Sequence, residues 1–536
     1  MSNSPQFPYE ADIPENLRIK SPVTVTEYLV NGEFHTHNGP FQQVKSPISL
    51  NTTEGIKENI IGSFPLLSKK EALMALNAAT EAYDHGNGLW PSMTVTERLN
   101  AMERFLEQMK LKRQEVTNLL MWETAKPLKD SEKEFDRTVD YIYQTIAEVR
   151  KQENRSAFEV TQGVIGKIKK RPIGVVLCMG PFNYPLNETF TTLMPALLMG
   201  NTVIFKPAKI GVLLIAPLME AFKNCFPKGV INIVFGRGRD TVGQIMETGK
   251  VDAFAFIGTS KSANEIKNKH PKPNRLRSVL ALEAKNPAVL LPHSDLDIAA
   301  RECVMGSLSF NGQRCTAIKI IFVHTSIAEK FIEKFTGAVT ELKRGMPWEN
   351  NVFLTPLPEP DKPGYLKELI EDAESKGARV INENGGKLTN TFFEPAVLYP
   401  VSLDMRVTQE EQFGPVIPIM PFDDINTVLE YLKDSDYGQQ LSLFGNQAEE
   451  VGLLIDKLIN YVCRINLNSQ CQRSPDNFPF NGRKDSAYGT LSVTDALNEF
   501  SIPTVVSAKE SASEKLILSD IVNQKKSKFL ANEFIL

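Results

Sequence analysis

Residues 173–179, IGVVLCM, form the first of four short apolar runs in the middle of the chain. The others are TVIF at 202–205, VINIVF at 230–235 and VDAFAFI at 251–257, with helical patterns such as residues 186–199 between them. Runs of this length favour buried strands, and their alternation with helices is typical of βαβ units. We therefore predict an α/β domain built around a parallel sheet.

A second series of the same kind follows. Residues 288–291 and 317–323 are apolar and flank a helix that is expected to start near Asp295. A second α/β domain is therefore predicted, with Glu283 near the crossing between the two domains. Because ligand clefts usually lie between domains, we expect the functional site there.

Helices are expected to dominate the region before the first sheet. Ser68 with Glu71, and Thr94 with Glu97, have the spacing in which a side-chain oxygen and a carboxylate bind free amides at a helix start. A further long helix is predicted from about residue 130 to 149.

The stretch Phe310-Asn311-Gly312-Gln313-Arg314-Cys315-Thr316 sets one thiol beside a guanidinium group in a turn that contains a glycine. A neighbouring cation favours the thiolate, which is the reactive form of cysteine. Glu283, after another apolar run, supplies a carboxylate, and Asn183 supplies an amide donor on a loop flanked by prolines. Together these residues predict covalent catalysis at a carbonyl group.

In the order Asn183, Glu283, Cys315, these motifs resemble those of the aldehyde dehydrogenase superfamily, and the likeness extends from about residue 20 to about residue 505. Further features resemble one branch, the NADP-dependent non-phosphorylating glyceraldehyde-3-phosphate dehydrogenases. These features are Gly312-Gln313-Arg314-Cys315, Asp136-Arg137-Thr138, Asn183-Tyr184, and Gln472-Arg473 with the following Asp476-Asn477-Phe478-Pro479-Phe480.

The resemblance implies that Cys315 attacks an aldehyde and that the amide of Asn183 helps to hold the resulting oxyanion. The cysteine would form a thiohemiacetal and then a thioester, and Glu283 would activate the water that hydrolyses it. In this branch Arg137, Tyr184, Arg314 and Arg473 would hold a substrate phosphate, because guanidinium groups suit that anion geometrically.

The cofactor implied by the resemblance is NADP, with NAD as the other possibility. Gly236, Gly238 and Gly243 do not have the spacing of the common dinucleotide fingerprint. Lys209 occupies the place where many NAD-using relatives carry a glutamate, so a 2′-phosphate would be attracted there. The implied cofactor-binding residues are Phe182, Lys206, Lys209, Gly238, Gly258, Thr259, Glu411 and Phe413. No metal site is expected.

The sequence departs from the family around the proton acceptor, where it is Ala281-Leu282-Glu283-Ala284-Lys285 with no glycine pair. If two residues have been lost before Lys285, Glu283 is the family glutamate. If nothing has been lost, Ala281 stands at that position and Glu283 lies two residues further on. A shift of two along an extended segment keeps a side chain on the same face.

The resemblance also implies a domain division. A Rossmann-like cofactor domain would comprise residues 18–149 and 173–281, a catalytic domain residues 282–480, and a small β oligomerisation domain residues 150–172 and 489–508. Residues 157–171 alternate in polarity and predict a hairpin for this third unit, which implies a homodimer or homotetramer. Residues 1–17 are predicted to be an arm without a core, and residues 509–536 a solvated extension, with a subunit contact as the alternative.

Bulk composition limits the other classes of function. The 536 residues carry a net charge of −4 with interspersed signs, so nothing indicates a nucleic-acid partner. No apolar run approaches the roughly 18 residues of a membrane span, and the polar start does not resemble a signal peptide. Six cysteines without metal-like spacing fit a reducing compartment. We therefore expect a cytoplasmic protein without membrane partners.

The function implied by these residues is oxidation of D-glyceraldehyde 3-phosphate to 3-phosphoglycerate with NADP and without inorganic phosphate. One alternative is a dehydrogenase for another anionic aldehyde, such as a semialdehyde acid. Another is a catalytically weak relative that retains the fold for binding or as a scaffold, which the displaced carboxylate of Glu283 motivates.

Overall fold

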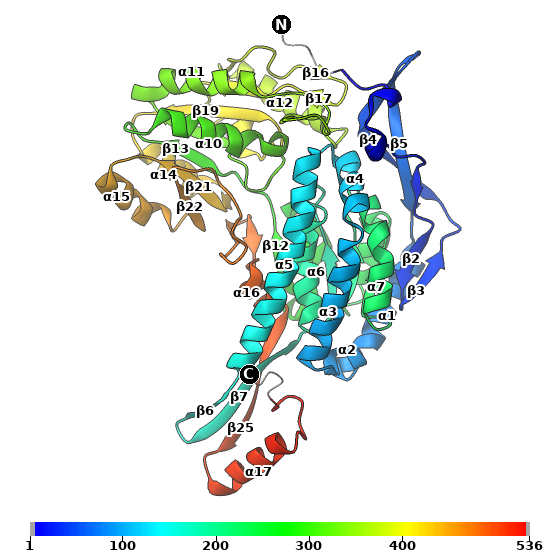
Figure 1. The fold of residues 1–536 in the computed structure, drawn as a ribbon. Coiled ribbons are helices and arrows are strands. Elements are labelled where there is room, and N and C mark those ends of the chain that lie inside the picture. Colours follow the sequence, from blue (N-terminus) through cyan, green and yellow to red (C-terminus); the bar gives the residue numbers. More distant parts are fainter. Residues whose placement is uncertain (1–5, 532–536) are drawn as a thin grey trace.

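The computed structural model describes residues 6–531, and Figure 1 shows two α/β domains with a small β unit that projects from one of them. The first domain has a six-stranded sheet of order β10-β9-β8-β11-β12-β24, parallel except for β24. The four apolar runs of the sequence form β8 to β11, which confirms the predicted fold class. The strands are β8 (Val175–Met179), β9 (Thr202–Lys206), β10 (Ile231–Ile233), β11 (Ala253–Ile257), β12 (Arg277–Ala281) and β24 (Ala487–Tyr488).

Some helices contact the sheet directly, and others contact it through a helix in between. Helices α1 and α6 contact β9, and α3 and α5 contact the side of α6 that faces away from the sheet. Both predicted capping boxes are present, so that α1 begins directly after Ser68 and α3 directly after Thr94. The helices are α1 (Lys69–Tyr83), α2 (Leu89–Ser92), α3 (Val95–Lys110), α4 (Arg113–Thr124), α5 (Leu128–Arg155), α6 (Asn187–Leu198), α7 (Met219–Cys225), α8 (Gly238–Met246) and α9 (Ser260–Lys267).

The second domain has a seven-stranded sheet of order β15-β18-β19-β14-β13-β21-β22, in which only the edge strand β15 is antiparallel to its neighbour. Its strands are β13 (Pro287–Leu290), β14 (Ile320–His324), β15 (Arg379–Val380), β18 (Ala396–Tyr399), β19 (Val416–Phe422), β21 (Gln440–Phe444) and β22 (Arg464–Leu467). Its main helices are α10 (Leu296–Leu308), α11 (Thr325–Glu341), α12 (Lys362–Ser375), α14 (Asn426–Asp434) and α15 (Ala448–Leu458).

The chain crosses twice between the two domains. Residues 282–286 lead from β12 to β13, and the segment after β22 returns to the first sheet at β24. The backbone N–H of Leu282 donates to the carbonyl oxygen of Ser486, at 2.9 Å, which ties the two crossings together. Strand β12 and Glu283 therefore lead directly into the junction of the two domains.

The N-terminal strands pack against the first domain on its outer side (Figure 1). They are β1 (Val23–Thr24), β2 (Glu27–Val30), β3 (Glu33–Thr36), β4 (Phe41–Thr52) and β5 (Gly55–Pro65). The predicted arm differs from expectation, because Phe7, Ile13 and Leu17 are buried. The indole N–H of Trp122 donates to the carbonyl oxygen of Leu17 at 2.7 Å. Residues 1–5 of the predicted arm lie outside the described residues.

The projecting unit is a three-stranded antiparallel sheet of order β25-β7-β6, formed by β6 (Phe158–Thr161), β7 (Val164–Pro172) and β25 (Ser501–Lys509). Within the predicted range 489–508, only the part from Ser501 is in this sheet. Helix α16 (Val493–Glu499) packs on α5 and α6 instead, because its apolar face is buried there. The boundary predicted at residue 150 falls inside α5.

The C-terminal extension up to residue 531 is ordered and largely exposed, and no residue of its helix is buried. It forms helix α17 (Ala512–Asn523) and then returns to the projecting sheet, where Leu530 is buried. The ammonium groups of Lys167 and Lys169 donate to the carbonyl oxygens of Leu530 and Ala531 at 2.8 and 2.7 Å. Residues 532–536 of this predicted extension lie outside the described residues. Over residues 6–531, no helix combines the length and the apolar character needed to cross a bilayer.

Candidate active site

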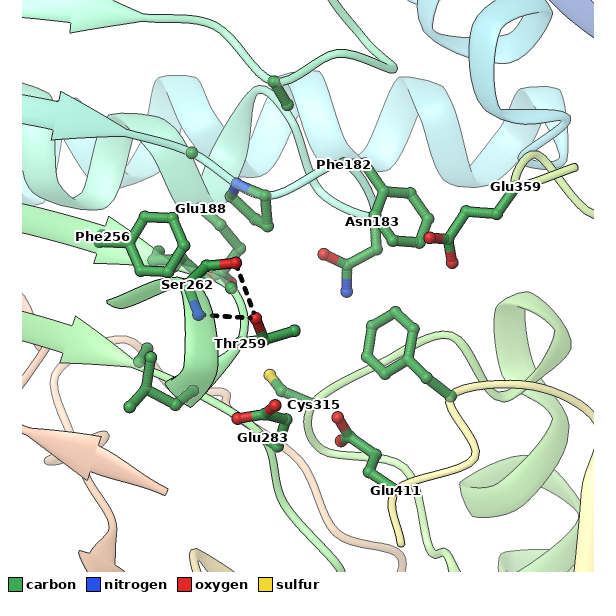
Figure 2. Close-up of a pocket in the computed structure, with 18 of the residues that line it drawn as sticks. Phe182, Asn183, Glu188, Phe256, Thr259, Ser262, Glu283, Cys315, Glu359 and Glu411 are labelled. Atoms are coloured by element: carbon green, nitrogen blue, oxygen red, sulfur yellow. Dashed lines mark hydrogen bonds between the residues drawn. The ribbon is translucent and has the colours of Figure 1, made fainter. Parts of the chain in front are cut away.

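A cavity of about 860 Å³ lies at the junction of the two domains. Figure 2 shows Asn183 and Phe182 on one side of it, with Cys315, Glu283 and Glu411 on the other. Its lining comes from the ends of β8, β9, β11 and β12 and from loops of the second domain. The topology therefore brings together the three predicted catalytic residues, which are far apart in the sequence.

Cys315 is presented by a strained turn after α10. Phe310 and Asn311 both have left-handed backbone angles, with φ of 50° and 54°. Gly312 has φ of 72°, and a Cβ placed on it would lie 2.7 Å from the carbonyl oxygen of Ser307. The side-chain amide of Asn311 donates to the carbonyl oxygen of Thr355 at 2.9 Å. This bond and the absence of a side chain at Gly312 allow the turn to place Cys315 at the cavity.

Asn183 reaches the turn that carries the thiol. Its side-chain Nδ2 donates to the carbonyl oxygen of Gln313 at 2.9 Å. Its own carbonyl oxygen accepts a hydrogen bond from Lys126 Nζ at 2.7 Å, and Lys126 forms a buried ion pair with Glu134. The amide is thus held against the turn that carries Cys315.

The Cys315 thiol is stabilised in its protonated form. Burial and the carboxylates of Glu188 and Glu411 raise its pKa, while Lys319 and Arg473 oppose the rise, and the net pKa is about 11. The expectation that Arg314 supplies the activating cation is corrected by the structure. Arg314 Nη2 donates to the carbonyl oxygen of Gly306 at 2.9 Å, and the opposing charges come from Lys319 and Arg473.

Glu283 lines the cavity but is bound to the first residue of α9. Its Oε2 accepts the backbone N–H of Ser260 at 2.6 Å. Burial raises the pKa of this carboxyl group, and the bond from Ser260 opposes the rise. Ala281, the alternative position for the proton acceptor, ends β12 and carries no ionisable group.

A second, smaller cavity of about 220 Å³ adjoins Cys315. The structure brings all four predicted substrate-binding residues to this cavity from four separate parts of the chain. Its lining residues are Arg137, Tyr184, Glu188, Arg314, Cys315, Thr316, Gln470, Gln472, Arg473 and Ser474. Tyr184 is held there by Lys126, whose ammonium nitrogen lies 3.7 Å from the centre of its ring.

Two carboxylates bind the guanidinium groups of this cavity. Arg137 makes a two-pronged ion pair with Asp476, with distances of 2.6 and 3.0 Å. Arg473 forms an ion pair with Glu188 and lies 3.5 Å from Asp476. Arg473 Nη2 and Arg314 Nε are nevertheless buried with no hydrogen-bond partner within the described chain. Both N–H groups are covered by neighbouring atoms, so an anion would reach them only after the surrounding side chains move.

Sequence reasoning missed Glu188, Asp476 as a charge partner, and Lys319. Lys319 Nζ lies 2.7 Å from Glu411 and donates to the carbonyl oxygen of Cys315 at 2.9 Å. The one signal for Glu188 was an acidic residue at the start of an otherwise apolar helix, five positions after Asn183.

The predicted cofactor residues line connected parts of the same cleft. Phe182, Lys206, Lys209, Gly258, Thr259, Glu411 and Phe413 line the main cavity, and the rings of Phe182 and Phe413 lie 5.8 Å apart, edge to face. Lys206 and Lys209 also line a further cavity of about 570 Å³, together with Gly238. Burial lowers the pKa of Lys206 to about 8.

The charges of this further cavity fit a nucleotide with an additional phosphate. Arg237 and Arg239 join the two lysines in its lining, and in the described chain no carboxylate lines it. Four basic side chains around one cavity suit a 2′-phosphate by charge. Across residues 6–531, no group of three or more His, Cys, Asp or Glu side chains is placed to hold a metal ion.

The fold and this constellation match a known family. The model of the aldehyde dehydrogenase family matches residues 43–506, and the chain therefore belongs to the aldehyde dehydrogenase family. It is 32% identical to the NADP-dependent glyceraldehyde-3-phosphate dehydrogenase of Streptococcus equinus, over 85% of this chain and 94% of the relative. It is 28% identical to the lactaldehyde dehydrogenase of Methanocaldococcus jannaschii, over 84% and 95% of the two chains.

Solved structures of the family superimpose on this chain. The NADP-dependent glyceraldehyde-3-phosphate dehydrogenase of Bacillus halodurans C-125, complexed with NADP, has a TM-score of 0.82 and 30% identity. That match covers 91% of this chain and 99% of the other. The lactaldehyde dehydrogenase of Escherichia coli has the same TM-score with 25% identity, and covers 91% and 100% of the two chains.

Proposed function

We propose that this chain oxidises D-glyceraldehyde 3-phosphate to 3-phosphoglycerate with NADP and without inorganic phosphate. The observation that carries the proposal is the small cavity in which Arg137, Arg314, Arg473 and Tyr184 meet Cys315. In a three-carbon aldehyde that ends in a phosphate, the aldehyde carbon would meet Cys315 while the phosphate lies among the guanidinium groups. The similarity to glyceraldehyde-3-phosphate dehydrogenases supports the same substrate.

The charge balance of the small cavity supports an anionic substrate. Three guanidinium groups face two carboxylates, Glu188 and Asp476, so a positive charge remains. Once the surrounding side chains have moved, a phosphate would accept the free N–H groups of Arg473 and Arg314. Each charge-assisted hydrogen bond of this kind contributes about 1.5–3 kcal/mol.

The residues of the cofactor cleft support NADP. Lys206, Lys209, Arg237 and Arg239 would hold the 2′-phosphate, while Phe182, Thr259 and Glu411 line the part of the cleft that leads to Cys315. When bound, NADP accepts the hydride that leaves the substrate carbon. The chain's own contribution is to bind the nucleotide and to position the thiol beside it.

In the proposed reaction, Cys315 Sγ loses its proton and bonds to the aldehyde carbon. The oxyanion of the thiohemiacetal lies near Asn183 Nδ2, which would exchange its bond to the Gln313 carbonyl for the oxyanion. After hydride loss, a thioester joins the acyl group to Cys315. Water then hydrolyses this thioester with the help of a carboxylate, which the sequence predicts to be Glu283.

The test follows NADPH absorbance with the purified chain, NADP and D-glyceraldehyde 3-phosphate in buffer without phosphate. We expect steady formation of NADPH that is lost in Cys315→Ser and is slower with NAD in place of NADP. No Cys315-dependent signal with this aldehyde would reject the proposed substrate.

A second candidate is the oxidation of another anionic aldehyde, such as a semialdehyde acid, or of lactaldehyde. Lactaldehyde, which is uncharged, is favoured by the two carboxylates that already bind Arg137 and Arg473, and by the similarity to lactaldehyde dehydrogenases. Rates with D-glyceraldehyde 3-phosphate and succinate semialdehyde, before and after Arg473→Ala, separate the two candidates. If the cavity binds phosphate, Arg473→Ala should lower the rate with D-glyceraldehyde 3-phosphate more than the rate with succinate semialdehyde.

The proposal includes a homodimer or homotetramer. Ile168 and Val505 are cross-strand partners on the projecting sheet, and each is 57% exposed. Together they present an apolar face that a second copy would cover. Light scattering on the purified protein measures the mass and so tests this part of the proposal.

A further inference from the structure

Glu188 is the carboxylate that shares both cavities with the thiol. Within the described chain, Glu188 and Cys315 are the two residues that line the main cavity and the small cavity together. Glu188 is the second residue of α6 and is only 6% exposed. An ionisable side chain so deeply buried beside a nucleophile is a candidate for a catalytic role.

Five other carboxylates line the main cavity, those of Glu283, Glu359, Asp361, Glu410 and Glu411, and two of them are engaged on its cofactor side. Glu411 pairs with Lys319 and accepts the backbone N–H of Ala284 at 3.1 Å. Glu283 accepts the backbone N–H of Ser260, next to the predicted cofactor residues Gly258 and Thr259. Both contacts orient these carboxylates toward backbone or charge partners at the nucleotide end of the cleft.

The nearby carboxylates differ in how strongly their charges raise the pKa of the Cys315 thiol. After burial, the charge that most strongly raises the pKa of Cys315 is that of Glu188, and Glu411 has a smaller effect. Glu188 is thus the carboxylate whose charge acts most directly at the sulfur.

We propose that Glu188 accepts the proton of the water that hydrolyses the Cys315 thioester. This inference rests on the proposed function, because it assigns one step of that reaction. A proton passes from water to a Glu188 oxygen while the water oxygen bonds to the acyl carbon. The bond from this carbon to Sγ then breaks, and Cys315 leaves as a thiolate. The products are the carboxylic acid and a protonated Glu188, which returns its proton to solvent.

Arg473 links this proton transfer to the anion cavity. Its Nη1 binds Glu188 in the empty site, so that this carboxylate oxygen is occupied by the guanidinium group. An anion that binds Arg473 competes for the guanidinium group and so releases Glu188. The substrate's charged end would therefore prepare the carboxylate for the later hydrolysis step.

The test compares Glu188→Gln with Glu283→Gln by stopped-flow measurement of NADPH. General acid–base groups typically contribute about 10²–10⁴-fold. In Glu188→Gln we therefore expect one rapid equivalent of NADPH per site, followed by a steady rate that is lower by that factor. Hydroxylamine should restore turnover, because it attacks the thioester without a protein base. Glu188→Asp should recover part of the rate, and Glu265→Gln, an exposed carboxylate of α9, serves as the matched control.

Glu283→Gln should behave differently, because its carboxylate binds the cofactor segment. We expect weaker nucleotide binding, measured by NADPH fluorescence, and no burst followed by arrest. A burst and arrest in Glu283→Gln, or wild-type turnover in Glu188→Gln, would overturn the assignment. So would the absence of any burst in a Glu188→Gln protein that unfolds at the wild-type temperature, since acylation would then have failed first.

The proposed substrate and the proposed role of Glu188 can be rejected independently of each other. If the wild type does not oxidise D-glyceraldehyde 3-phosphate, the same comparison is made with lactaldehyde, and the role of Glu188 is judged there. If the wild type itself forms one equivalent and stops with each aldehyde, Glu188 does not act as proposed and the chain is a catalytically weak relative.

Discussion

The Cys315 thiol lies among opposed charges. Glu188 disfavours the thiolate, and Lys319 and Arg473 favour it, so that burial and charge together leave the pKa near 11. At neutral pH the nucleophile is therefore protonated in the empty site, and binding of substrate and cofactor must accompany its deprotonation.

This balance predicts the pH dependence of alkylation. Since only the thiolate reacts, the rate with iodoacetamide should rise about tenfold per pH unit below the pKa and level off near pH 11. Glu188→Gln removes a nearby negative charge, so the midpoint should move to lower pH and alkylation at pH 9 should become faster. Mass spectrometry of the Cys315 peptide gives the rate, with Cys315→Ser as the blank. An unchanged or higher midpoint would contradict the arrangement of charges.

Glu188→Gln is predicted to change two reactions of Cys315 in opposite directions, which distinguishes the proposed role of Glu188 from a structural one. Glu188→Gln should accelerate alkylation, because it removes electrostatic repulsion, and should slow hydrolysis, because it removes a proton acceptor. A purely structural role for Glu188 would impair both reactions together.

At the scale of elements, the turn after α10 determines where the thiol lies. A Cβ on Gly312 would meet the carbonyl oxygens of Ser307 and Gly414 at 2.7 and 2.9 Å, and φ there is 72°. The turn thus depends on a glycine both for its conformation and for the space it leaves.

Gly312→Ala is therefore expected to destabilise the protein. A strained left-handed residue costs about 1–3 kcal/mol, and the contacts with backbone oxygens add to this. Urea unfolding should show the loss, together with a fall in NADPH formation. Gly337→Ala in α11 is the matched control, because no atom lies within 4 Å of its added Cβ, and helix propensity favours alanine by about 0.5–1 kcal/mol. Equal stability of Gly312→Ala and the wild type would show that the turn is not constrained in this way.

Many of the helices and strands could be predicted from local sequence. The apolar runs specify β8 to β11, and the capping boxes at Ser68 and Thr94 specify where α1 and α3 begin. The signals work because they depend on neighbouring residues. Helix α16 escaped prediction as part of the first domain, because its position depends on contacts with α5 and α6 that are distant in sequence.

At the scale of the whole molecule, the topology carries Asn183 and Cys315 to one cavity although different domains contribute them. Motifs predicted their meeting, but local sequence does not specify side-chain directions. Arg314 is next to Cys315 in sequence, yet its guanidinium group binds the carbonyl oxygen of Gly306. Glu188 has the position of an ordinary acidic residue at a helix start, and its ion pair with Arg473 joins residues 285 positions apart, which local sequence does not indicate.

The proposed function depends most on the recognition of a phosphate by the arginine cavity beside Cys315. The direct measurement is kcat/KM of the wild type for D-glyceraldehyde 3-phosphate and for unphosphorylated D-glyceraldehyde, both with NADP. Two charge-assisted hydrogen bonds of about 1.5–3 kcal/mol each predict a preference of at least about 100-fold for the phosphorylated aldehyde. Equal values, or a preference for D-glyceraldehyde, would contradict it.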